Sequence, residues 1–171
     1  MTRGDAYYWA GGQKVALAAD SRIAVDETRA REHGLWGGEL SAAAESAGHT
    51  VGDGMVLLPA GSVSGPLRDQ LDRTGASAPV YRADDSLIVV RPEVRMETAP
   101  ATSASDVRTA IGRIDSDASV HEPKPGRFVV KPSSGRGADA LKLANRLAEE
   151  LQPDVAQARF VRITPPQSAV D

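Results

Sequence analysis

Cysteine is absent from this chain of 171 residues, and aromatic residues are scarce, at 4% of the sequence. The lack of cysteine excludes disulfides, thiolate metal sites and cysteine nucleophiles. Because the chain has only two Phe, two Trp and three Tyr, its core has to be built from Ala, Val, Leu and Ile. Small aliphatic cores of this kind favour small lobes.

Long hydrophobic runs and an excess of positive charge are also missing. No run reaches the length of a membrane span, and residues 1–20 lack the apolar core of a signal peptide. The net charge is −3, whereas a nucleic-acid-binding domain normally presents a basic face. Ala, Gly and Arg are abundant relative to Lys and Asn, which is typical of bacteria with GC-rich genomes. We therefore expect a cytoplasmic bacterial protein that binds neither nucleic acid nor a membrane.

Motifs for catalysis, metal binding and cofactor binding are weak. His33, His49 and His121 have no spacing that would assemble a metal or catalytic site. The string Gly135-Arg-Gly-Ala-Asp-Ala has the G-x-G-x-x-A spacing of a dinucleotide-binding loop, but too little chain follows for the parallel strands of that fold. We interpret it as a flexible turn in which Asp139 caps a helix, and expect no enzymatic activity, no metal and no cofactor.

The second half of the chain shows a regular succession of elements. Apolar runs predict strands at 87–90, 118–121, 127–131 and 155–163, and apolar residues at helical spacing predict helices at 107–114 and 139–151. The resulting order βαββαβ is that of the ferredoxin-like fold, in which two helices cover one face of a four-stranded antiparallel sheet.

A weaker copy of the same order is predicted for the first half. Gly54, the strand 55–58, Pro59 and a helix carrying Leu67 and Leu71 parallel Gly126, the strand 128–130, Pro132 and the last helix. An internal repeat is the economical interpretation. We therefore predict an α+β protein with two tandem ferredoxin-like βαββαβ lobes that have antiparallel sheets. Residues 1–85 form an N-terminal lobe that starts with a β-hairpin, residues 86–163 form the second lobe, and residues 164–171 form a flexible tail.

Two groups of residues are candidates for binding a partner. In the strand 127–131, Arg127, Val129 and Lys131 alternate with apolar residues that should meet the helices, so these three would lie on an open sheet face. That face either docks a partner, is solvated, or packs on the other lobe. Trp9 and Trp36 belong to an aromatic group near the N-terminus, which either forms a partner patch or fills the small first lobe.

A family resemblance rests on three segments of the second half. They are Gly126-Arg-Phe-Val-Val-Lys-Pro, Asp139-Ala-Leu-Lys-Leu-Ala-Asn-Arg-Leu-Ala-Glu-Glu and Pro153-Asp-Val-Ala-Gln-Ala-Arg-Phe-Val. They resemble the end of the propeptide domain of bacterial subtilisin-like serine proteases, the subtilases. The serine, histidine and aspartate motifs of the catalytic domain are missing from this sequence.

The resemblance implies a non-catalytic function. Propeptides of this family act as folding chaperones and inhibitors: the sheet packs on the protease, and the C-terminal tail enters the substrate cleft. On this analogy Phe160, Val161 and Ile163 contact the partner. The resemblance therefore predicts a non-catalytic protein-binding module that inhibits, chaperones or tethers a subtilisin-like protease. An adaptor that keeps the fold and binds another protein is the alternative.

Overall fold

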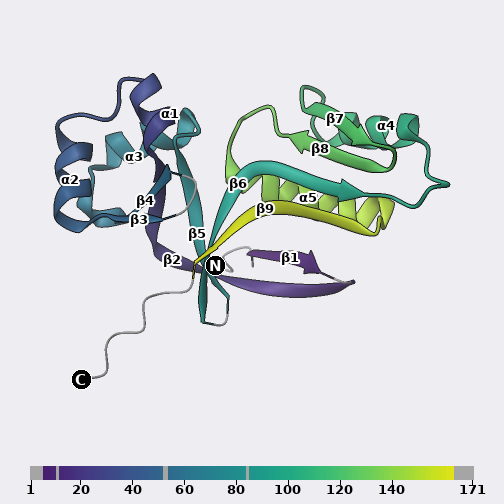
Figure 1. The fold of residues 1–171 in the computed structure, drawn as a ribbon, viewed down its shortest axis with the longest axis horizontal. Coiled ribbons are helices and arrows are strands. Elements are labelled where there is room, and N and C mark those ends of the chain that lie inside the picture. Colours follow the sequence, from purple (N-terminus) through teal and green to yellow (C-terminus); the bar gives the residue numbers. More distant parts are fainter. Residues whose placement is uncertain (1–5, 11, 52–53, 84, 164–171) are drawn as a thin grey trace. The chain divides into compact units, whose positions relative to one another are not determined.

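The computed structural model describes residues 6–10, 12–51, 54–83 and 85–163. Contacts divide the chain into two compact units, each made of two segments. Unit 1 comprises Met1–Ala16 and Val90–Arg159, and unit 2 comprises Leu17–Val89 and Phe160–Asp171. Three strands pass from one unit into the other (Figure 1), namely β2 (Gln13–Asp26), β6 (Ser86–Glu97) and β9 (Val155–Ile163).

Unit 1 is a sheet with two helices. Its strands pair in the order β9-β6-β8-β7, where β7 is Ser119–Lys124 and β8 is Arg127–Lys131. The helices α4 (Ala104–Ile114) and α5 (Gly137–Leu151) lie together on one side of this sheet (Figure 1). The strand β1 (Ala6–Ala10) pairs with β2 and contacts α5. The N-terminal hairpin is therefore part of the same unit as the last helix.

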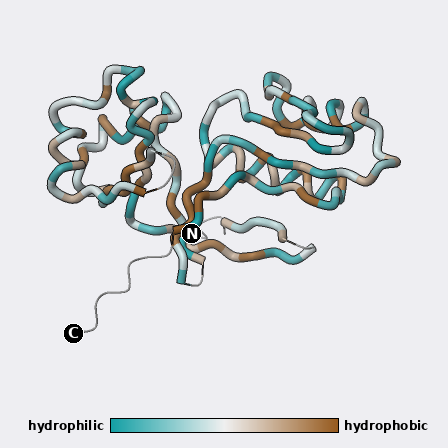
Figure 2. The backbone as a smooth tube through the Cα atoms, viewed as in Figure 1, coloured by the Kyte–Doolittle hydropathy of each residue, from teal (hydrophilic) through white to brown (hydrophobic). Residues whose placement is uncertain are grey.

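Apolar side chains at helical and strand spacing build the core of unit 1. The helix α4 begins after Ser103, whose hydroxyl accepts hydrogen bonds from the backbone N–H groups of Ser105 and Asp106. The helix α5 begins at Gly137 after Arg136, so the prediction that Asp139 caps it is wrong. The hydrophobic stretch of β8 is visible in Figure 2. The fully or almost fully buried residues of this core include Val94, Met96, Val107, Ile111, Phe128, Val130, Leu141 and Leu147.

Unit 2 is a sheet whose strands pair antiparallel in the order β3-β4-β2-β5-β6. The strand β3 (His49–Val51) forms one end, and β4 (Met55–Pro59) and β5 (Ser77–Ala83) flank β2. The helical elements are α1 (Glu27–Glu32), α2 (Glu39–Ala47), the 3-10 helix η2 (Ala60–Ser62) and α3 (Gly65–Arg73).

The two faces of the unit 2 sheet carry separate hydrophobic clusters. One cluster joins strand residues such as Val25 and Leu58 to Leu40 of α2 and Leu71 of α3. The other consists of buried strand residues, against which Val51, Val161 and Ile163 pack. The helices of unit 2 therefore cover one face, and the end of β9 packs on the other.

The prediction of two tandem ferredoxin-like βαββαβ lobes is wrong. The structure is mostly antiparallel sheet, and its long strands β2 and β6 run through both units. In the first half, α1 and α2 follow each other directly where the prediction has a single helix. The strand β2 continues through its polar residues 20–22, where a β-bulge lies between Ala19 and Ile23.

Candidate functional site

The candidate site is the face of the unit 1 sheet that faces away from α4 and α5. Along β8, Arg127 and Lys131 are exposed and Val129 is half-buried, whereas Phe128 and Val130 are 2% and 0% exposed. The alternation read from the sequence is therefore present, and it places Arg127, Val129 and Lys131 on one face. We call this surface the open face.

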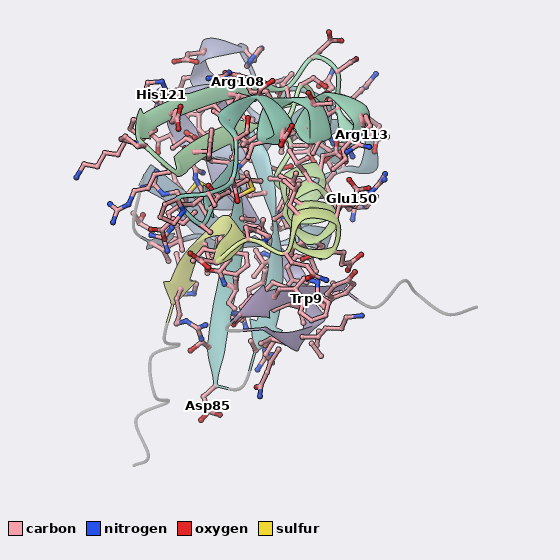
Figure 3. The ribbon with its side chains drawn as sticks, turned by 90° about the vertical axis from the view of Figure 1, so that its right-hand side faces the viewer. Trp9, Asp85, Arg108, Arg113, His121 and Glu150 are labelled. Atoms are coloured by element: carbon pink, nitrogen blue, oxygen red, sulfur yellow. The ribbon has the colours of Figure 1, made fainter. Side chains whose placement is uncertain are left out.

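Strand pairing brings further side chains onto the open face. Val129 lies opposite Arg95 of β6 and His121 of β7. Arg127 lies opposite Glu97 of β6 and Lys124 of β7. Cross-strand partners share a face of the sheet, so Val129 lies between two polar rows. His121 is among the residues labelled in Figure 3, which views unit 1 from the side.

The charges of the open face are only partly paired. Arg127 Nε lies 3.2 Å from Glu97 Oε1, and Arg159 Nη1 of β9 lies 3.9 Å from Glu93 Oε2 of β6. The other three cations meet no carboxylate among the described residues; they are Arg95, Lys124 and Lys131. All three are exposed. The face therefore combines a small apolar centre at Val129 with unpaired positive charge.

Arg95, Glu97 and Lys124 are among the open-face residues that were not singled out in the sequence. Arg95 and Glu97 alternate with the buried Val94 and Met96 along β6, and this pattern was visible in the sequence. The position of Lys124 could not be predicted from alternation along β7, because a register shift between His121 and Lys124 places it opposite Arg127.

Trp9 lies in unit 1 in a polar aromatic cluster on α5. The Tyr7 hydroxyl and the Trp9 indole N–H both donate to Glu149 Oε2, at 2.7 and 3.1 Å. The two rings are T-shaped with centroids 6.2 Å apart, and the Lys14 ammonium lies 4.2 Å from the Tyr7 centroid. Asn145, 7% exposed, donates to the Tyr7 carbonyl at 2.7 Å. The cluster therefore ties the N-terminal hairpin to α5.

Hydrogen bonding within this cluster shifts two pKa values in opposite directions. The hydrogen bond from Tyr7 and then that from Trp9 lower the pKa of Glu149. The same bond to Glu149 raises the pKa of the Tyr7 hydroxyl, with smaller contributions from burial and from the carboxylate charge. A hollow of about 490 Å³ adjoins the cluster, lined by Trp9, Gly12, Ala148, Glu149, Gln152 and Pro153.

Trp36 belongs to unit 2 and is not part of the Trp9 cluster. It is half-buried and packs against the cluster that contains Val25, Leu40 and Leu71. The Arg31 guanidinium lies 5.4 Å from the Trp36 ring centroid, a cation–π contact. Its main contacts are therefore those of a residue that fills the lobe.

Phe160, Val161 and Ile163 form the end of β9 in unit 2, and all three are half-buried. Val161 and Ile163 pack against the second hydrophobic cluster. Ile163 also lines a hollow of about 500 Å³ together with Arg22, Ala47, His49, Thr50, Val51, Leu57, Pro59 and Leu87. The predicted flexible tail, 164–171, lies outside the described residues.

Within residues 6–10, 12–51, 54–83 and 85–163, no group of three or more His, Asp or Glu residues is placed to hold a metal ion. None of the helices formed by these residues combines the length and hydrophobicity needed to cross a membrane. No protein-family model, no curated protein and no solved structure matches this chain.

Proposed function

We propose that this chain is a non-catalytic protein-binding module that docks through the open face. The observation that carries the proposal is a half-buried Val129 with exposed charged neighbours on a sheet whose other face packs on α4 and α5. A polar rim around an apolar centre is the usual composition of a protein–protein interface.

The partner that we propose is a subtilisin-like serine protease. The support is the resemblance of residues 126–132, 139–150 and 153–161 to subtilase propeptides; these segments include β8 and most of α5 and β9. In that family the module acts as folding chaperone and inhibitor, and a tether is a third mode that we propose for this chain. Val161 and Ile163 pack in unit 2, so we assign the first contact with the protease to the open face rather than to these two residues.

Binding to a catalytic domain tests the proposal. A subtilisin-like catalytic domain, with its nucleophilic serine replaced by alanine to prevent proteolysis, is immobilised, and the full chain is passed over it. We expect saturable binding that Val129→Asp weakens at least tenfold, because the aspartate places a desolvated charge at the interface centre. Ala42→Asp is the control, since Ala42 is an exposed residue of α2 in unit 2.

Activity measurements then separate the three modes of action. Slow, tight inhibition of the active protease that is lost on deleting residues 164–171 would identify an inhibitor. A higher refolding yield of the denatured catalytic domain without inhibition would identify a chaperone, and binding with neither effect would identify a tether. Absence of binding to every subtilisin-like domain tried would refute the proposed partner.

A further inference from the structure

We propose that the open face recognises an acidic protein surface, and that long-range attraction between the two surfaces speeds their association. The inference rests on the proposed function in taking the partner to be a protein. It deepens that function by naming the chemistry of the surface that fits, and it follows from charges on the open face.

The first step is the charge of the face itself. Among the charged residues described above, five cations, Arg95, Lys124, Arg127, Lys131 and Arg159, stand against two carboxylates, Glu93 and Glu97. These seven residues carry an excess of three positive charges on a chain whose net charge is −3, so the remainder of the chain carries six excess negative charges. Charge is therefore unevenly distributed along the chain, and the open face is a positive patch of unit 1.

The second step is that these cations are available to a partner. Arg95, Lys124 and Lys131 are exposed and form no ion pair within the described part of the chain. An unpaired, solvated cation gives up little on meeting a carboxylate of a partner, because no internal pair has to be broken. Charges of this kind act mainly on the association rate and on specificity.

The third step distinguishes a protein from a nucleic acid as the occupant. Glu93 and Glu97 stand among the cations and would repel a phosphate backbone, whereas a mosaic of both signs suits a protein surface. The centre of the face is Val129, an aliphatic side chain, rather than an aromatic ring on which a base could stack. We therefore assign the face to an acidic patch of a folded protein.

The experiment compares two variants with the same change in net charge. The face variant, R95Q/K124Q/K131Q, removes the three unpaired cations. The helix variant, R108Q/R113Q/K142Q, removes three exposed cations of α4 and α5, on the other side of the same sheet; Figure 3 shows Arg108 and Arg113 on α4. Both lower the net charge by three, so a difference between them reports position and not total charge.

Association rates with the inactivated catalytic domain are measured from about 0.01 M to about 1 M salt, over which the Debye length falls from about 30 Å to about 3 Å. We expect the wild-type rate constant to fall at least tenfold over this range. In the face variant the low-salt rate constant drops about tenfold and its salt dependence flattens, while the helix variant keeps the wild-type behaviour. A salt-independent wild-type rate, or equal losses in both variants, would overturn the inference.

A second probe separates this inference from the proposed function. Poly-L-glutamate presents acidic polypeptide without any protease, and a single-stranded RNA of similar charge presents phosphate. Poly-L-glutamate binding that is lost only in the face variant upholds the inference even if no catalytic domain binds, in which case the proposed function alone fails. Tighter binding of the RNA would overturn the inference in favour of a nucleic-acid site, and binding of neither polymer would also overturn it.

Discussion

Adjacent valines of β8 provide the sharpest test of the open face. Val130 is 0% exposed and lies between Val94 of β6 and Val120 of β7, whereas Val129 is half-buried on the open face. Val130→Ala removes two methyl groups from the core of unit 1. At about 0.8 kcal/mol for each buried carbon, the transfer free energy lost is about 1.6 kcal/mol. The cavity left behind raises the expected cost to about 2–3 kcal/mol.

Val129→Ala removes the same atoms from a partly solvated position and should cost about 0.5 kcal/mol. For a chain of this size, about 1 kcal/mol corresponds to about 2–4 °C in Tm. Thermal unfolding followed by circular dichroism should therefore place the Val130 variant about 5–10 °C below the wild type and the Val129 variant within about 2 °C of it. Equal losses for the two variants would show that the assignment of inner and outer faces of β8 is wrong.

Three further predictions concern individual contacts. Because the hydrogen bond from Tyr7 lowers the pKa of Glu149, the stabilisation it gives is fully present above the unfolded value of 4.5 and is lost as pH falls through the folded value. Glu149→Gln should therefore flatten the acid limb of a plot of Tm against pH, and an unchanged limb would contradict this. Gly126→Ala should lower stability by about 1–2 kcal/mol in urea titrations, since Gly126 has φ of 79° and an added Cβ would lie 3.2 Å from the Thr98 carbonyl oxygen. Asp20→Asn should cost about 1–3 kcal/mol by the same measurement, because this carboxylate, with 4% of its side chain exposed, pairs with two arginines in unit 2; a neutral effect would show that the pairs contribute nothing.

Local periodicity allowed much of unit 1 to be predicted. In α4, Val107, Ala110 and Ile111 are buried as their spacing indicated, and β8 alternates as expected. Such patterns depend on neighbours a few residues away, so they can be recognised in the sequence itself. The helix α5 was also located, although its start was misplaced at Asp139 because the Arg136 N-cap has no side-chain capping bond to reveal it.

The rest of the fold depends on pairings that no local pattern encodes. The polar residues Asp20 and Arg22 suggest a break, yet Asp20 accepts hydrogen bonds from Arg22 and Arg82, which keeps β2 paired with β5 on both sides of the bulge. Arg82 lies 62 positions further along the chain, so its hydrogen bond to Asp20 could not be predicted from the local sequence. Likewise, the place of Trp9 depends on Glu149 of α5, 140 positions away.

The open face also contains a feature that stability alone does not account for. Lys124 lies directly opposite Arg127 on neighbouring strands, and like charges in that arrangement destabilise a sheet. Glu97 offsets Arg127 on the other side, but Lys124 itself has no carboxylate partner among the described residues. Replacing Lys124 with glutamine should therefore leave the free protein equally stable or slightly more stable. If the same change slows docking, the charge serves recognition, because a purely structural role would make stability and docking fall together.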